Sequence, residues 1–355
     1  VAAGAALVDG KGTAQVRATG MDGGAGDDTL VNEGEIKTRT VEAVAHATGV
    51  SVALNLSLAG GAAGASITDS SANALTVVHG LDGAAGNDRL VNRGTVDVQG
   101  KASAGSVGVS VTVSGALGPA VGASIADASS TARADVFGVD AGEGDDKTLN
   151  EGSVAADASA VAKGTSVSIV VPNVFGGYSA ATLASSATAH AVGLNDADSA
   201  APAPCGHVKQ AATGQDESPC GRDGHGGKSA LPTDRDGGDG HGGRGGRGAT
   251  LANAGSVTAT ATATATGTSV SGALFGYSLG DVGNTALAEA AGVRSGARDD
   301  GILNEGSLTA GSAATASGLT VSVTVAGTAN GQAETTAVAQ ALGIDSGAGD
   351  DLIDN

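Results

Sequence analysis

The sequence predicts an all-β fold, an elongated β-solenoid of the parallel β-helix or β-roll kind with about 50–60 residues in each repeat. Three observations predict it. Landmark residues recur at fixed spacing, small and polar residues alternate along each repeat, and the composition is rich in glycine and nearly free of aromatic residues. An antiparallel β-meander, with its loops as turns along one edge, is the alternative arrangement.

The repeat is defined by two glycines and an asparagine. The upstream glycine lies 16 residues before the downstream glycine in all six copies, and the asparagine follows 12 residues later in five of them. The upstream glycines are Gly4, Gly64, Gly122, Gly177, Gly276 and Gly327, the downstream glycines are Gly20, Gly80, Gly138, Gly193, Gly292 and Gly343, and the asparagines are Asn32, Asn92, Asn150, Asn253, Asn304 and Asn355. In a solenoid these asparagines would stack as a hydrogen-bonded ladder, whereas in isolated turns they would serve as turn formers.

Each repeat alternates with period two, as a strand does. Alanine stands ten residues after every upstream glycine, at Ala14, Ala74, Ala132, Ala187, Ala286 and Ala337, while charged residues take the opposite parity. Such small inward residues require the opposing sheets to approach closely. The repeat array is expected over residues 1–195 and 249–355, with an insertion at 196–248, and we expect the chain to be a segment of a longer array.

The composition excludes several classes of protein. With 61 glycines, five aromatic residues and no tryptophan in 355 residues, the chain lacks the large side chains of an ordinary enzyme core, and no enzymatic activity is expected. Its net charge of −19 opposes binding to nucleic acid. No run of about 20 apolar residues is present, so membrane insertion as a helix is not expected either.

An Asp-rich loop between the downstream glycine and the asparagine is the recurring motif that carries chemistry. It reads GMDGGAGDD at Gly20, GLDGAAGND at Gly80 and GVDAGEGDD at Gly138, with a degenerate copy at Gly292 and a further copy at Gly343. Closely spaced oxygen ligands suit calcium. The candidate ligands are Asp22, Asp27, Asp28, Asp82, Asn87, Asp88, Asp140, Asp145, Asp146, Asp299, Asp300, Asp345, Asp350 and Asp351. A solvated Asp-Gly turn without metal is the alternative interpretation.

These loops resemble the calcium-binding nonapeptide of the hemolysin-type (RTX) repeat proteins. Residues 23–31, GGAGDDTLV, match the G-G-x-G-x-D-x-U-x pattern, and the loops near Asp88 and Asp351 resemble it more loosely. The resemblance implies calcium held between Gly-Asp loops of adjacent coils, with Leu30 and Leu90 as core residues. In that family the nonapeptides run in tandem, whereas here each loop stands alone, so calcium binding requires long coils that stack the loops above one another.

The insertion at 196–248 holds both cysteines, Cys205 and Cys220, and three of the six histidines. A local disulfide between the two cysteines is the favoured interpretation, which implies an oxidising compartment. A zinc site formed by Cys205, His207, Cys220 and His225 is an alternative, although the usual ligand spacings are lacking. The remaining histidines, His46, His79 and His190, have no nucleophilic partner at a recurring position and are expected to be solvated.

These observations predict a non-enzymatic repeat scaffold that is secreted or displayed on the cell surface and is stabilised by calcium in its Asp-rich loops. Such an array resembles the stalks of large repetitive bacterial surface adhesins or the subunits of an extracellular filament. The alternatives are a ligand- or ice-binding solenoid surface, suggested by six alternating threonines at 258–268, and a passenger domain of a secreted virulence factor. Expected partners are further copies of the chain, joined end to end or in a filament, and an unknown receptor or surface ligand.

Overall fold

The chain forms a wide, flattened parallel β-solenoid with one coil per repeat. The computed structural model describes residues 2–37, 43–57, 62–114, 121–172, 176–196 and 247–355. Within these ranges, strand pairs between successive coils are parallel throughout. The predicted solenoid is therefore confirmed, and the antiparallel meander is wrong.

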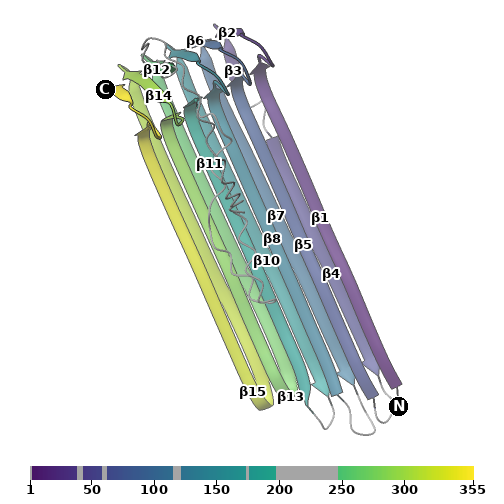
Figure 1. Ribbon diagram of the computed structural model, residues 1–355. Helices are drawn as coiled ribbons and strands as arrows, with labels where there is room; N and C mark the ends of the chain where they lie inside the picture. The colour runs from purple at the N-terminus through teal and green to yellow at the C-terminus, as the bar shows by residue number, and fades with distance from the viewer. Residues whose placement is uncertain (1, 38–42, 58–61, 115–120, 173–175, 197–246) are drawn as a thin grey trace, which may run out of the picture.

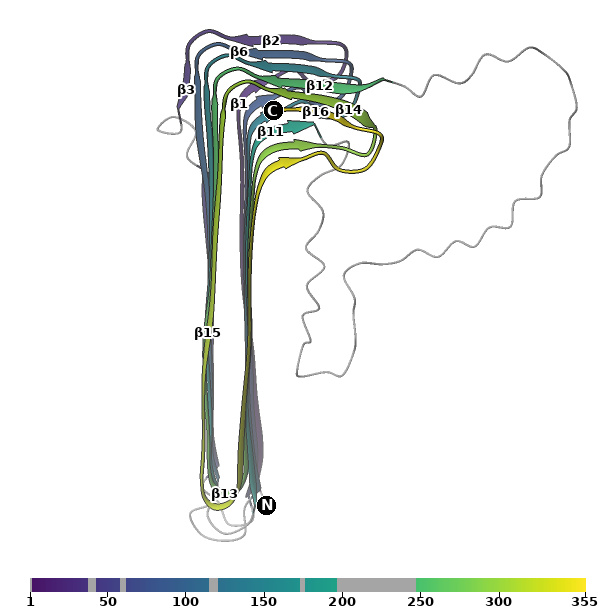
Figure 2. The same cartoon turned by 90° about the vertical axis from the view of Figure 1, so that its left-hand side faces the viewer.

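Each coil runs up one long wall, across a cap and down a second wall (Figure 2). The first wall contains β1 (Ala2–Asp22), β5 (Ala62–Asp82), β8 (Val121–Asp140) and β11 (Gly177–Asp196). The second wall contains β3 (Glu35–Lys37), β4 (Ala43–Ser57), β7 (Thr95–Ser114) and β10 (Ser153–Pro172). β13 (Ser256–Ser295) and β15 (Ser307–Asp345) each run through both walls, which joins the walls into one folded sheet.

A separate six-stranded cap sheet closes one end of the walls (Figures 1 and 2). Its strands are β2 (Thr29–Asn32), β6 (Arg89–Asn92), β9 (Lys147–Asn150), β12 (Arg247–Asn253), β14 (Asp299–Asn304) and β16 (Leu352–Asp354). A wall strand of 20 residues spans about 66 Å, whereas six coils stack over only about 29 Å. The described part of the molecule is therefore a slab whose long dimension lies along the strands.

The landmark residues of the sequence occupy equivalent positions in successive coils. Gly4, Gly64, Gly122, Gly177, Gly276 and Gly327 are partners in register along the first wall. The asparagines form the predicted ladder at the end of the cap strands: each donates from Nδ2 to Oδ1 of the next, from Asn32 through to Asn355, and the first four bonds measure 2.7–2.8 Å.

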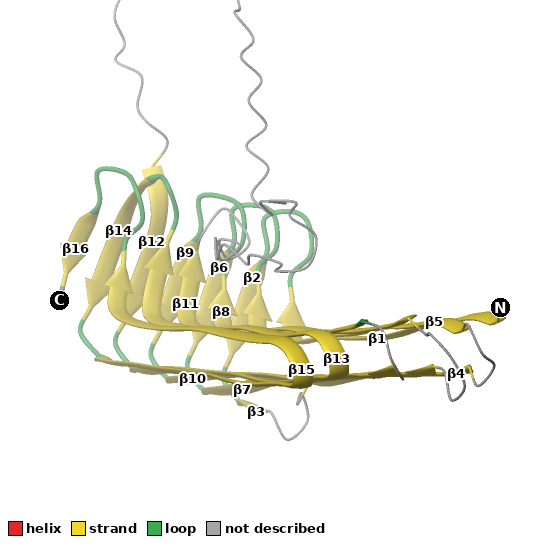
Figure 3. Ribbon diagram, turned by 90° about the horizontal axis from the view of Figure 1, so that it is seen from below, coloured by secondary structure: helices red, strands yellow, loops and turns green. Residues whose placement is uncertain are grey.

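The interior between the walls has two halves of different chemistry. The alanine half lies next to the cap sheet and is filled by fully buried alanines such as Ala74, Ala132 and Ala187, with Leu81 and Leu90 beneath the cap. The serine half lies at the far end, where Ser66, Ser110, Ser124, Ser168 and Ser179 point inward. Figure 3 shows the walls as two thin layers facing each other.

The walls of the serine half are joined by hydrogen bonds from side chains. Ser110 Oγ donates to the carbonyl of Ser66 at 2.7 Å, Ser124 Oγ to that of Ser110 at 2.8 Å, and Ser168 Oγ to that of Ser124 at 2.7 Å. Each bond crosses between the walls. The approach is so close that a Cβ on Gly49 would lie 2.3 Å from the carbonyl oxygen of Ser71 on the opposite wall. At Gly49 the gap between the walls therefore leaves no room for a side chain.

An elbow ends each first-wall strand. At the downstream glycine the strand bends outward into the Asp-rich loop, which then turns back over the cap (Figure 2). A Cβ on Gly80 at this bend would lie 2.3 Å from both Val96 Cγ1 and the carbonyl oxygen of Gly138, so only glycine fits. Beyond the elbow, Gly24 and Gly26 adopt φ values of 87° and 122°, which side chains disfavour.

Candidate functional site

The first three Asp-rich loops stack directly on one another. Parallel bridges join Ala25 to Ala85 and Ala85 to Glu143, and Gly26 N donates to Ala85 O at 2.8 Å. The last two loops also pair, through a bond of 3.1 Å from Ala348 N to Gly296 O. In the fourth coil the chain leaves the described residues after Asp196, and Asn195 stands at the register position of Asp140. Loops of five coils are therefore stacked, in a group of three and a group of two, although within the described chain no three of their candidate aspartates have ligand atoms within 4.8 Å of one another.

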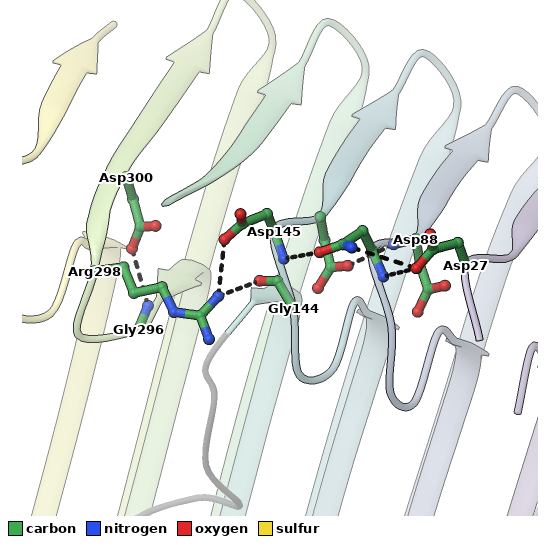
Figure 4. Close-up of polar contacts among 9 residues, drawn as sticks. Asp27, Asp88, Gly144, Asp145, Gly296, Arg298 and Asp300 are labelled. Carbon is green, nitrogen blue, oxygen red and sulfur yellow. Dashed lines mark hydrogen bonds and ion pairs between the residues drawn. The ribbon is translucent and has the colours of Figure 1, made fainter. Parts of the chain in front are cut away.

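Two columns of side chains bind the stacked loops together. In the inner column, Asp28 N donates to Asp88 Oδ1 and Asp88 N to Asp146 Oδ1, both at 2.7 Å. In the outer column, Asn87 N donates to Asp27 Oδ1 at 2.8 Å and Asp145 N to Asn87 Oδ1 at 2.9 Å (Figure 4). The last two loops repeat both contacts, from Asp300 N to Asp351 Oδ1 and from Asp350 N to Asp299 Oδ1. One oxygen of each accepting side chain thus receives an amide of a neighbouring coil.

The second oxygens of the inner column face a different environment. Asp28 Oδ2 and Asp88 Oδ2 are buried and have no hydrogen-bond partner in the part of the chain that the structure describes. Asp88 Oδ2 lies against the bare Cα of Gly83, where a Cβ would approach it to 2.8 Å. Burial, together with the charges of Asp28 and Asp27, raises the pKa of the Asp88 carboxyl. A cation at this column would relieve both the missing partner and the repulsion.

The degenerate fifth loop departs from the motif for a structural reason. Arg298 stands where other copies have glycine, and its Nη1 donates to Gly144 O at 2.8 Å and to Asp145 Oδ1 at 3.0 Å in the third loop (Figure 4). It therefore spans the level of the fourth coil, whose loop is replaced by the insertion. At the position of Asp82 and Asp140 the fifth coil has Arg294, which is buried.

The elbows of the second and third coils bring three polar side chains together. His79 precedes the bend and Asp82 follows it, and their Nδ1 and Oδ2 atoms lie 3.0 Å apart. Asp140 Oδ2, one coil further on, lies 3.3 Å from the same Nδ1 atom. The ligand atoms of these three side chains all lie within 4.8 Å of one another. His79 is only 7% exposed, so the expectation that it is solvated is wrong.

The two carboxyl groups at this elbow differ in their electrostatics. Burial acts to raise the pKa of Asp82. The contact with His79 and the charges of His79 and Arg17 lower it by more, so the pKa of Asp82 lies below its ordinary value. For Asp140, burial dominates over the charge of His79 and the amide of Asn195, so its pKa is raised. Sequence reasoning selected both aspartates but missed His79, since the elbow that covers this residue has no signal in the alternation of the strand.

A second buried cluster follows along the same wall. His190, at 4% exposure, contacts Arg294, and its expected solvation is also wrong. Burial, reinforced by the charges of Arg294 and Arg133, lowers the pKa of His190 to about 3, so its imidazole is neutral. Arg294 also pairs with Glu289 and with Asp345, whose Oδ2 lies 3.1 Å from Nε. This arginine is therefore neutralised by two carboxylates, one from its own coil and one from the next.

The other sequence predictions are placed as follows. Asp22 and Asp345 continue the register of Asp82 and Asp140 along the wall. Cys205 and Cys220, as well as His207 and His225 of the alternative zinc site, lie outside the described residues. The six threonines at 258–268 share the outer face of β13, but the adjoining strand places Asp157 and Lys163 beside Thr260 and Thr266. The row therefore borders charged residues on β10 and is continued in β15 at two positions, Thr309 and Thr315.

Comparisons of this chain with protein-family models, with curated proteins and with solved structures give no match. Among the residues that the structure describes, no helix is long and apolar enough to cross a membrane. The function is therefore inferred from the geometry of the fold and of its loops.

Proposed function

We propose that this chain is a non-enzymatic scaffold segment of an extracellular or surface-displayed repeat protein, such as an adhesin stalk or a filament subunit, whose Asp-rich loops bind calcium. The observation that carries the proposal is the inner aspartate column. Its stacked loops leave Asp28 Oδ2 and Asp88 Oδ2 buried, aligned and without hydrogen-bond partners among the described residues. Calcium prefers such oxygen ligands, and the resemblance of residues 23–31 to the RTX nonapeptide supports the same ion.

The scaffold role is supported by how the coils join. The asparagine ladder and the registered glycines continue from the first coil to the last, so further coils could add in the same manner. The outermost strands β1 and β15 leave backbone groups available for pairing. Calcium would couple folding to export, because the carboxylates repel one another in a calcium-poor cytoplasm and close around the ion outside the cell.

Thermal melting tests the calcium sites. Calcium at 100 times its dissociation constant adds about 2.7 kcal/mol to the free energy of unfolding per site, so the midpoint should rise by several degrees over that in chelator. The double variant Asp28→Asn with Asp88→Asn should lose this rise. Asp97→Asn, on the exposed outer face of β7 and outside the loops, is the matched control and should retain this rise. Melting curves that coincide in calcium and chelator, together with no heat of calcium binding in calorimetry, would overturn the calcium proposal.

A further inference from the structure

The elbow joining the second and third coils contains a site that the Asp-rich loops do not explain. We propose that His79, Asp82 and Asp140 bind a first-row divalent transition-metal ion, with Zn²⁺ as the probe. The distances from His79 Nδ1 to the two carboxylate oxygens are 3.0 and 3.3 Å. For bonds of about 2.1 Å, ligand atoms around one zinc ion lie about 3.0–3.4 Å apart at octahedral to tetrahedral angles. The two separations from Nδ1 match this range, and all three ligand atoms lie within 4.8 Å of one another.

The buried imidazole nitrogen provides the second observation. His79 Nδ1 makes no hydrogen bond among the described residues, although two carboxylate oxygens lie close to it. In an ordinary His–Asp pair, the ring N–H is directed at one oxygen. Here Nδ1 lies within 3.3 Å of both oxygens but makes no well-directed hydrogen bond to either, and the side chain is only 9% exposed. One ion between the three atoms would give Nδ1 a partner and would share Asp82 Oδ2 with Arg17, whose Nη2 lies 3.7 Å from that oxygen.

The ligand chemistry separates this site from the calcium loops. Imidazole nitrogen with two carboxylates suits zinc and its neighbours, whereas the loops offer oxygen alone. Neighbouring residues that would not contact the ion hold two of the ligands in place, as is common at metal sites. Asn195 Nδ2 donates to Asp140 Oδ1 at 2.8 Å, and the Phe137 ring packs 5.0 Å from that of His79. The ion would cross-link β5 to β8 and so join two coils.

Titration calorimetry with Zn²⁺ on the full chain tests the site. His79→Ala should remove one equivalent of bound zinc or raise its dissociation constant by about 100-fold or more, and Asn195→Ala should raise it by about 10-fold. His190→Gln, which replaces the other buried histidine of this wall, is the matched control and should leave zinc binding unchanged. If His79→Ala fails to fold, Asp140→Asn provides the same test with an isosteric side chain.

Two further readouts distinguish this site from the cysteines and from the calcium loops. Cys205 and Cys220 could form a separate metal site. When Co²⁺ replaces zinc, the equivalent of metal that His79→Ala removes should therefore absorb without a cobalt–thiolate band. The double variant Asp28→Asn with Asp88→Asn should still bind this equivalent of zinc. The zinc proposal is therefore tested independently of the calcium proposal. Zinc binding by His79→Ala and Asp140→Asn with the stoichiometry and affinity of the original chain would contradict the proposal.

A different observation concerns the outer face of the second wall in the serine half. We infer that this face pairs with the same face of a second copy of the chain. Its central column consists of one valine from each coil of the wall: Val52, Val109, Val167, Val270 and Val321. The columns beside it are mostly aliphatic, interrupted by Thr165, Thr268 and Gly272, and the large side chains of β4 and β15 in them are 56–73% exposed.

The size and flatness of this face favour a second copy as its occupant. Four columns across five strands cover about 600 Å² per chain, so that pairing would bury about 1,200 Å² in total, as stable dimers require. A monomer seldom exposes an apolar patch of this size. The surface is a mostly aliphatic plane without charged side chains, so a two-fold axis through it brings like columns of the two copies together. The first wall instead carries outward aspartates at the same level, such as Asp69 and Asp127.

Sedimentation equilibrium tests the pairing. The original chain should form a dimer whose dissociation constant rises by about 100-fold or more in Ile169→Lys, which places a charge in the middle of the patch. Thr262→Lys, on the same wall but in the alanine half, is the matched control and should dimerise like the original chain. A chain that stays monomeric at its highest soluble concentration, assembles into open-ended polymers only, or dimerises regardless of Ile169→Lys would show the inference to be wrong.

Discussion

The two halves of the interior share one backbone register but are filled in opposite ways. In the alanine half, apolar methyl groups point inward and polar residues such as Arg133 point outward. In the serine half of the second wall, hydroxyls point inward and valines outward, as with Ser110 and Val111. The comparison shows that hydrophobicity alone does not decide which residue of an alternating pair is buried.

The energetics of the two halves explain how both can be stable. A buried methyl contributes about 0.8 kcal/mol through the hydrophobic effect, and an intramolecular hydrogen bond about 0.5–1.5 kcal/mol net. A serine whose hydroxyl bonds a carbonyl on the facing wall is therefore worth about as much as a buried alanine. Valine would bury more area, yet at Gly49 the walls approach too closely even for a Cβ. Most large apolar side chains of this segment lie on the outer face, with the fully buried Val170 as an inward exception.

The largest expected effect is overpacking of the alanine half. Ala134 is fully buried between the walls, so Ala134→Leu must separate them and should lower the free energy of unfolding by about 3 kcal/mol. Urea denaturation measures this loss. The control is Thr262→Leu, which adds a comparable volume on the outer face and should change the stability by less than about 0.5 kcal/mol. Equal effects of the two variants would mean that the interior is not closely packed.

The register of the coils could be predicted from the sequence, because coils that stack in parallel must repeat their glycines and asparagines at equivalent positions. The contacts between side chains at the elbow could not be predicted from the sequence. Val78 and His79 alternate as inward and outward residues of a strand do, but the bend at Gly80 places Asp82 against the outward histidine. The contact depends on where the next segment passes, which neither parity nor spacing encodes. For the same reason, the cross-wall partners of the serines could not be assigned from their own repeat.

Acid should separate the two halves, with a smaller effect than overpacking. His190 faces Arg294 and Glu289 on β13 and Arg133 and Asp135 on β8, and its pKa is about 3, against 6.5 when unfolded. The unfolded chain therefore takes up a proton below pH 6.5 while the folded chain does not. The stability from the neutral imidazole is complete above pH 6.5 and is lost as the pH falls toward 3, by about 2 kcal/mol at pH 5.

The measurement is the difference in unfolding free energy between the original chain and His190→Gln from pH 7.5 to pH 5. Burial raises the pKa of Asp135, which acts in the opposite direction, but this contribution is common to both chains and cancels in the difference. Hydrogen exchange at pH 5 should show lost protection around residues 187–195 before the serine half. An identical pH dependence of the two chains would show that His190 is not the acid-sensitive group.

The smallest expected effect comes from removing a single hydroxyl, and it tests the comparison between the two halves most directly. Ser124→Ala removes the bond to the carbonyl of Ser110 and should cost about 1 kcal/mol in urea denaturation, since one net hydrogen bond is lost and a small apolar group remains. Ser159→Ala, on the outer side of β10, is the control and should be nearly neutral. If Ser124→Ala is also neutral, the cross-wall bonds add no net stability and the serines are selected only for their size. A cost near that of Ala134→Leu would instead mean that the bonded chain of serines acts as one cooperative unit, in which removing one hydroxyl weakens the bonds of its neighbours.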